Sequence, residues 1–186
     1  MAKTRASQIE NRNFLAPVGF KFNLQRSPGA AFFCNQANIP DITLGVTEQP
    51  SYLRQIPTPG DMMDFGDLNI RFLVDEDLKN FMEIQNWMRG LGFPESVQEF
   101  RDLQSSGQLP KKDYVQEGHD IYSDGTLQIL SSNLNAKFNV KFRDLFPVSL
   151  TTITFDATDT DIEYFTADVT FKYTLYELTT VTNEAL

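Results

Sequence analysis

Apolar and polar residues alternate strictly near the C-terminal end of the chain, from Phe165 to Leu175. Successive side chains of a strand point to opposite faces, so this period of two predicts a long β-strand with one face in water. Shorter alternations at 20–25, 68–74 and 138–143 predict three more strands of the same kind. The chain also carries 16 Phe and 6 Tyr residues, which favour half-buried pleated surfaces. These features predict a β-rich fold.

Turn-forming residues and short apolar runs predict the remaining elements. We expect strands at 30–34, 127–129 and 148–155, a hairpin with arms at 42–47 and 52–56, turns at 26–29 and 123–125, and loops at 57–66 and 104–120. Pro147 is expected to end the strand that contains 138–143. Residues 1–13 are polar without periodicity, so they are expected to form a flexible N-terminal arm.

A helix is expected directly after the strand at 68–74. Asp75 can serve as its N-cap, and apolar residues then recur at helical spacing as far as Leu91. Gly90 and Gly92 supply residues that commonly end a helix. A second, shorter amphipathic helix is expected at 94–103.

The first helix is expected to pack on the sheet through Leu78, Phe81 and Trp87, as part of the core. The predicted fold class is therefore mainly β, an antiparallel β-sandwich or barrel with one flanking α-helix. The sequence has no internal repeat, and its 186 residues fit a single domain spanning 1–186.

The charge balance restricts the partners of this chain. It has 16 Lys+Arg and 25 Asp+Glu residues, a formal net charge of −9. Binding nucleic acid through its phosphates requires a basic face, so this balance argues against a nucleic-acid-binding protein. No apolar stretch is long enough for a membrane span, and residues 1–14 lack the apolar core of a secretory signal, so we expect synthesis in the cytosol and no membrane partner.

Residues that could support catalysis or metal binding are few. Cys34 is the single cysteine, which excludes an intrachain disulfide and a multi-Cys zinc site. The single histidine, His119, is expected to lie solvated in a polar loop. The best metal candidate is the acidic run of Asp156, Asp159, Asp161 and Glu163, but it lacks the spacing of a calcium loop and is better explained as a solvated turn. We therefore expect no catalytic residue, cofactor or metal, and a protein that is not an enzyme.

Four segments carry a resemblance to a known family. The block DFGDLNIRFLVDEDLKNFMEIQNWM (64–88), in which a strand runs through an acidic turn into a helix, resembles the tail tube proteins of contractile-tailed bacteriophages. The segments FRDLFPVSLTTITFD (142–156) and IEYFTADVTFKYTLYEL (162–178) are similar to later strands of that family. FFCNQANIP (32–40) is similar to the strand and bend that open its long hairpin.

The resemblance implies a structural subunit that forms hexameric rings, stacked into a tube through which DNA leaves the capsid. The implied partners are copies of the chain itself, the sheath protein, the tape-measure protein, the baseplate and tail terminator proteins, and DNA in transit without specific binding. The implied location is the phage tail of the virion, assembled in the host cytoplasm. An acidic wall suits such a conduit because it does not retain DNA.

Two alternatives within this resemblance stay open. The segment 93–125 is longer than a minimal tube subunit needs, which suits a decorated tube or a baseplate protein that initiates the tube. A tube protein of a related contractile injection system is the other alternative. A soluble binding or catalytic β-domain is the competing class of function.

The resemblance also suggests which residues make contacts in the assembly. If the hairpin at 42–56 lines the channel, Glu48 and Gln49 near its tip are candidates for the lumen or the junction between rings, and Arg54 needs a carboxylate neighbour. The loops at 57–66 and 104–119 are expected to make contacts between subunits and to become ordered on assembly. Their candidate contact residues are Asp61, Asp64, Lys111 and Lys112.

Overall fold

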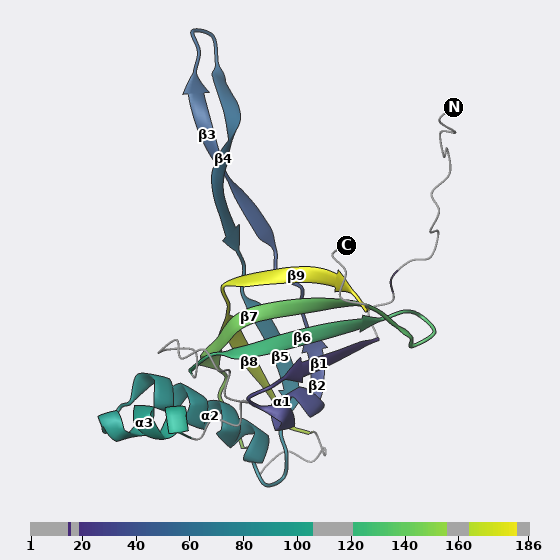
Figure 1. Cartoon of the computed structure of the whole chain (residues 1–186), viewed down its shortest axis with the longest axis vertical. Coiled ribbons are helices and arrows are strands. Elements are labelled where there is room, and N and C mark those ends of the chain that lie inside the picture. The colour runs from purple at the N-terminus through teal and green to yellow at the C-terminus, as the bar shows by residue number, and fades with distance from the viewer. Residues whose placement is uncertain (1–14, 16–18, 106–120, 156–163, 182–186) are drawn as a thin grey trace.

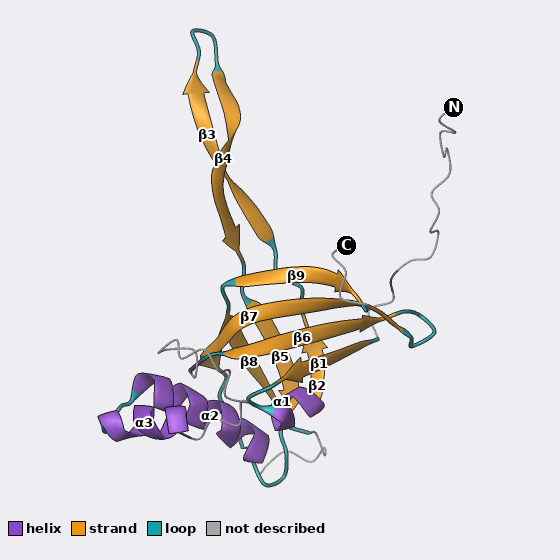
Figure 2. Cartoon of the chain, in the orientation of Figure 1, coloured by secondary structure: helices purple, strands orange, loops and turns teal. Residues whose placement is uncertain are grey.

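The computed structural model of the protein describes residues 15, 19–105, 121–155 and 164–181. This part of the chain contains nine strands and three helices (Figures 1 and 2). They are β1 (Phe20–Leu24), α1 (Pro28–Phe32), β2 (Cys34–Ala37), β3 (Ile42–Pro50), β4 (Gln55–Phe65), β5 (Leu68–Leu73), α2 (Lys79–Gly92), α3 (Val97–Ser105), β6 (Ser123–Leu130), β7 (Ala136–Leu150), β8 (Thr166–Lys172) and β9 (Leu175–Thr180). The predicted mainly β fold class is confirmed.

Seven of the strands form one antiparallel sheet that folds over itself. Its order is β1-β6-β7-β8-β5-β2, and β9 pairs with β7 beside this path. The first part of β7 lies between β6 and β9, whereas its last part, from Phe146 to Leu150, pairs with β8. Asp144, between the two parts, has a left-handed φ of 56°. The two halves of the sheet lie as two layers in Figure 1, which gives the expected antiparallel sandwich with open edges.

The core lies between these two layers. Inward residues alternate along each strand, so that β5, β6 and β8 each show the period-two burial pattern that the sequence indicates. The largest fully buried side chains are Trp87, Phe72, Phe142, Phe171, Leu24, Leu68, Ile84 and Leu145. Helix α2 adds Ile84 and Trp87 to this core.

Two expected breaks in the strands are wrong. Gly125 belongs to β6 rather than to a turn. A Cβ at this position would lie 2.4 Å from Cδ1 of Leu145, so a glycine is needed here to make room for that side chain. Pro147 lies inside β7, at a register shift where the ladder is irregular and a residue without an N–H is tolerated. The separate strand expected at 148–155 is therefore absent from the described residues, and β7 ends at Leu150.

The alternation from Phe165 to Leu175 does not form one strand. The chain leaves the layer of β5 and β8 after Lys172, and β9 begins at Leu175 in the other layer, beside β7. At the crossing, the N–H of Thr174 donates to the carbonyl of Arg143. In β8 the buried residues are Ala167, Val169 and Phe171, whereas in β9 Tyr176 shares a face with the buried Phe142 and Leu175 shares the opposite face with Arg143. The face that meets the core therefore changes at the crossing, although the alternation in the sequence runs on to Leu175.

Helix α2 begins three residues later than expected, with its N-cap at Leu78 rather than at Asp75. The N–H of Asp75 donates to the side chain of Asn80, and Leu78, in the left-handed region with φ 57°, occupies the N-cap. Leu78 is 37% exposed, so its expected place in the core is wrong. Phe81 is half-buried against the core, and Trp87 is buried, with its ring centroid 6.1 Å from that of Phe171.

The segment before β2 also differs from its prediction. Residues 28–32 form the short helix α1, with Pro28 in its first turn, where the missing N–H costs nothing. The turn expected at 26–29 and the strand expected at 30–34 are both wrong, and the strand begins only at Cys34. The second helix expected at 94–103 is present as α3.

Several expectations lie outside the described residues. These are the arm at 1–13, the loop residues 106–120 with Lys111, Lys112 and His119, and the acidic run at 156–163. Residues 104 and 105 of the expected loop belong to α3.

Candidate assembly interface

Strands β3 and β4 form a hairpin that projects from the body of the molecule (Figure 1). It is a separate two-stranded sheet, and its nine-residue strand β3 spans roughly 30 Å at about 3.3 Å per residue. The loop expected at 57–66 is therefore wrong, since these residues belong almost entirely to β4. Pro57 and Pro59 predict a loop, but a two-stranded ribbon consists of two edge strands, which tolerate proline.

The hairpin has one apolar and one mainly polar face. Cross-strand partners share a face, and the pairs Ile42–Phe65, Leu44–Met63 and Val46–Pro59 make the apolar face. The pairs Thr43–Asp64, Thr47–Thr58 and Gln49–Ile56 make the other face. We call these the apolar face and the polar face of the hairpin.

Beyond Phe65 at its root, whose ring contacts Tyr173 and Tyr176, the apolar face is largely exposed in the described part of the chain. Every residue of β3 is exposed, and Leu44 and Val46 are 50% and 66% exposed. A two-stranded hairpin with one apolar face in water is marginal at best, because it lacks a surface to bury that face against. An exposed apolar face of this kind is a candidate surface for contact with another molecule.

Two glycines face each other halfway along the hairpin. Gly45 and Gly60 lie where the register shifts between Leu44 and Val46. A Cβ on Gly60 would lie 2.7 Å from the carbonyl oxygen of Gly45, so the strands cross closely only because Gly60 has no side chain. Figure 1 shows that the ribbon is twisted along its length.

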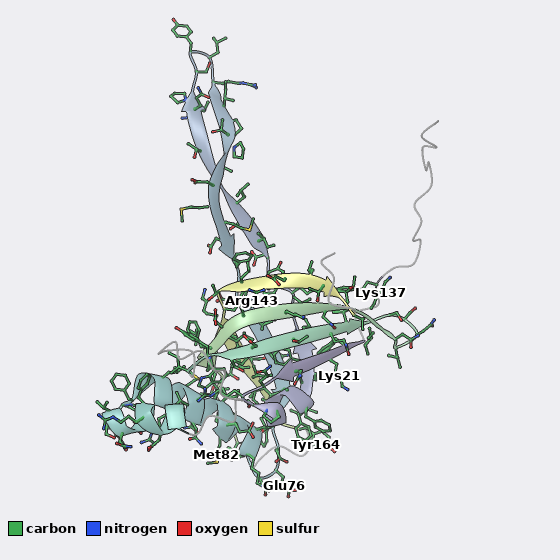
Figure 3. The ribbon with its side chains drawn as sticks, viewed as in Figure 1. Lys21, Glu76, Met82, Lys137, Arg143 and Tyr164 are labelled. Carbon is green, nitrogen blue, oxygen red and sulfur yellow. The ribbon has the colours of Figure 1, made fainter. Side chains whose placement is uncertain are left out.

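The tip of the hairpin also exposes large apolar side chains. Residues Ser51 to Arg54 connect the strands, and the N–H of Ser51 donates to the carbonyl of Arg54 at 3.1 Å. Tyr52 and Leu53 are almost fully exposed. Figure 3 shows side chains along the hairpin, with no other element beside its outer part.

The structure separates the residues proposed for the lumen. Glu48 pairs with Pro57 on the apolar side of the ribbon, whereas Gln49 lies on the polar face. Among the described residues, no carboxylate pairs with Arg54. Asp64 lies on the polar face opposite Thr43, and Asp61 lies on the part of β4 where the register shifts.

Sequence reasoning missed the apolar face as a surface. The alternation of Ile42, Leu44 and Val46 is visible in the sequence, but it does not by itself show that the subunit leaves this face exposed. In the structure β3 and β4 form a sheet of their own, separate from the seven-stranded sheet of the body. Met63, which completes this face, lies in the stretch that was expected to be a loop.

The body of the molecule has free sheet edges. Strands β1 and β2 end the seven-stranded path, and within the described residues β9 pairs on one side only, with β7. Unpaired edges present rows of N–H and C=O groups that can pair with a strand of another copy. In Figure 3, Lys21 lies on the edge strand β1.

The described residues offer little chemistry. They contain no cluster of three His, Cys, Asp or Glu side chains placed to hold a metal ion. Burial raises the pKa of the Cys34 thiol to about 11, so the thiol stays protonated and is a poor nucleophile at neutral pH. In this same part of the chain, no helix is both long and apolar enough to cross a membrane.

Comparison with known proteins agrees with an assembly role for the fold. The sequence model described as phage tail tube protein matches residues 11–179. No curated protein sequence matches the chain.

Solved structures share its fold at low identity. The tube–sheath complex of the PVC extracellular contractile injection system, in its extended state, contains a chain that is 18% identical, with a TM-score of 0.55 and coverage of 96% of this chain and 99% of that one. The tube-terminating cap of the anti-feeding prophage is 14% identical, with a TM-score of 0.58 and coverage of 97% and 100%. The PVC sheath/tube terminator is 17% identical, with a TM-score of 0.54 and coverage of 91% and 99%. At these identities the likeness concerns the fold alone.

Proposed function

The chain belongs to the phage tail tube protein family and is a structural subunit of a tail tube, and on this premise we propose that its copies join into hexameric rings that stack inside a contractile sheath. The hairpin is the observation that carries this proposal. Its apolar face is exposed along β3 within the described subunit, and a neighbouring copy supplies the surface that covers it. The ring number of six rests on the resemblance of the sequence to the family.

Lateral contacts within a ring use the free edges of the sheet. An edge of one subunit pairs with an edge of the next, and a rotation that closes the ring leaves no edge exposed. The open edges of β1, β2 and β9 support this arrangement.

Contacts between rings are head-to-tail. The hairpin extends from one end of the body, and α2 and α3 lie at the other end (Figure 1). Different surfaces at the two ends make a heterologous contact, which repeats without limit along an axis.

The polar face of the hairpin is the face that we assign to the bore. Gln49 and Asp64 are the lumen residues in this arrangement, while Glu48 lies on the side that meets the neighbouring copy. A wall of carboxylates and neutral polar groups does not hold phosphates, which suits DNA in transit. Asp61, Arg54, Lys111 and Lys112 are assigned to contacts between subunits.

The remaining partners are the sheath, tape-measure, baseplate and tail terminator proteins. Support comes from the solved structures with this fold, which include a sheath–tube complex, a tube terminator and a tube cap. The proposed location is the tail of the virion, after assembly in the host cytoplasm. The role is structural and includes no catalytic step.

Two related roles are alternatives. A baseplate tube initiator forms a single ring rather than a long tube, and support for this alternative comes from a chain of the anti-feeding prophage baseplate that shares the fold. A tube protein of a contractile injection system forms tubes of the same kind with a different cargo.

The test compares two neighbouring residues of β3. Val46→Asp places a charge on the apolar face, and Thr47→Asp places the same charge on the polar face. Both positions are exposed, so both variants should melt at the temperature of the unchanged protein. Negative-stain microscopy and sedimentation then measure the length and amount of assembled tube.

We expect tubes of uniform bore from the unchanged protein and from Thr47→Asp, and free subunits from Val46→Asp. Rings that never stack would favour the initiator. Tubes from Val46→Asp at the unchanged concentration would show that the apolar face is not an interface.

A further inference from the structure

The direction of the hairpin is set at its root rather than along its length. Because β3 and β4 form a separate sheet, no ladder hydrogen bond joins them to the seven-stranded sheet. The chain enters the hairpin through residues 38–41 and leaves it through residues 66–67. Any interaction that holds the ribbon at a fixed angle to the body must therefore act on these two connections.

Two tyrosines hold both connections. The hydroxyl of Tyr173 donates to the carbonyl oxygen of Gly66 at 2.9 Å, and the hydroxyl of Tyr176 donates to the carbonyl oxygen of Pro40 at 3.1 Å. Gly66 directly follows β4, and Pro40 lies two residues before β3. The N–H of Gly66 also donates to the carbonyl of Asp41 at 3.0 Å, so the two connections are tied to each other as well.

A layer of aromatic rings joins this root to the core. The ring of Phe65, the last residue of β4, lies 6.3 Å from that of Tyr173 and 5.7 Å from that of Tyr176. The two tyrosine rings lie 6.0 Å apart and pack on the buried ring of Phe142, at 5.1 Å and 5.8 Å. Edge-to-face ring contacts prefer particular geometries, so this layer resists rotation of the ribbon better than an aliphatic contact would.

The same tyrosines lie beside a free edge of the sheet. Tyr173 occupies the crossing between β8 and β9, and Tyr176 is part of β9. The open side of β9 is one of the edges proposed for lateral pairing. The root of the hairpin and this edge are therefore held by one short segment.

We propose that Tyr173 and Tyr176 are positioning residues for assembly, which fix the angle between the hairpin and the β9 edge. A subunit joined along that edge then presents its hairpin in the direction that the next copy accepts. This inference rests on the proposed role of the hairpin as an assembly arm. A ribbon that spends only a tenth of its time in the accepted direction binds about tenfold more weakly, because only that fraction is competent.

The angle can be measured on free subunits. Spin labels on Leu53→Cys at the tip and Lys21→Cys on β1, in a Cys34→Ser background, report the distance between arm and body by pulsed electron paramagnetic resonance. The sample is kept below the concentration at which tubes form. The test variant is Tyr173→Phe/Tyr176→Phe, which keeps both rings and removes both hydroxyls.

The control is Tyr164→Phe, which removes a hydroxyl at the end of the body opposite the hairpin (Figure 3). We expect a narrow distance distribution in the parent and the control, and a broad one in the double variant. Without labels, the double variant should need roughly tenfold more protein to form tubes, as measured by light scattering. If the double variant does not fold, the two single Tyr→Phe variants replace it.

An unchanged distance distribution would overturn the inference, and so would a broad distribution with an unchanged threshold for assembly. The proposed function fails by a different result, since it requires Val46→Asp to abolish tubes whatever the tyrosines do. The distance measurement does not depend on assembly, so the two failures are distinguishable.

Discussion

Replacing Gly60 by alanine should damage assembly without weakening the body of the subunit. The added Cβ would lie 2.7 Å from the carbonyl oxygen of Gly45 and 3.0 Å from its carbonyl carbon, whereas ordinary contacts begin at 3.4 Å. The strands must therefore separate by about 3.4 − 2.7 = 0.7 Å, and both atoms belong to the backbone, which cannot swing aside as a side chain can. Overpacking of this kind costs ~1–3 kcal/mol.

The cost falls on the hairpin, because β3 and β4 share no ladder with the seven-stranded sheet. We expect the unfolding midpoint of the body, followed by circular dichroism, to stay within the scatter of the unchanged protein. If the distortion is transmitted fully to the contact between copies, ~1–3 kcal/mol corresponds to a roughly five- to 150-fold higher protein concentration for tube formation. Light scattering on a dilution series measures this threshold.

The matched control is Gly45→Ala in the facing strand. Its Cβ would lie 3.4 Å from the carbonyl oxygen of Met62, which is an ordinary contact, and both substitutions stiffen the unfolded chain equally. Gly45→Ala should therefore assemble as the unchanged protein does. Equal thresholds for the two variants would refute the argument that the close crossing shapes the arm.

Three further results are expected. Trp87→Ala should lower the free energy of unfolding by ~3–5 kcal/mol in urea titrations followed by circular dichroism, because the side chain is 2% exposed and its Nε1 donates to Ile121; a loss below ~1 kcal/mol would contradict its place in the core. Asp168→Asn should lower the free energy of unfolding by less than ~1 kcal/mol in the same assay, although the Asp168 carboxylate accepts two hydrogen bonds from Arg71. Both side chains are more than 40% exposed, so water screens the pair. A larger loss of stability would mean that the pair is not screened. Burial raises the pKa of Tyr173 to about 12, so the contribution of its hydroxyl to the free energy of unfolding should persist below pH 10 and disappear as the pH rises through 12. The difference in free energy of unfolding between the unchanged protein and Tyr173→Phe should shrink over that range. A constant difference would exclude the hydroxyl as its source.

The sequence was sufficient for the strands that have one buried face. The alternations around Ile70 and Val140 place apolar residues in the core as expected, because a period of two has one structural meaning when one face is wet. It failed where composition and context conflict. The segment of Pro57, Pro59 and Gly60 indicates a loop because such residues are excluded from a central strand. They are tolerated here because both strands of the ribbon are edge strands.

The sequence also could not show where the chain changes layers. The alternation through Lys172 and Leu175 is continuous, while the strand partners change from β5 to β7. For the candidate assembly surface, the alternation of Ile42, Leu44 and Val46 indicates a strand with one apolar face, yet every residue of β3 is exposed, and the pattern of one chain does not show what would cover that face. The tyrosine contacts at the root join residues more than a hundred positions apart, a distance that no local pattern spans.

The path of β7 has a consequence for how the subunit comes apart. One continuous strand of fifteen residues supplies the ladder partners of β6 and β9 in one layer and of β8 in the other. Loss of the β7 hydrogen bonds in one layer also disturbs the part of β7 that pairs in the other layer. The two layers are therefore expected to unfold in a single transition. The hairpin shares no ladder with β7. It can therefore fray, be shortened or be lengthened while the body still unfolds cooperatively. Variation in the length of the arm is therefore the change that this architecture tolerates most easily.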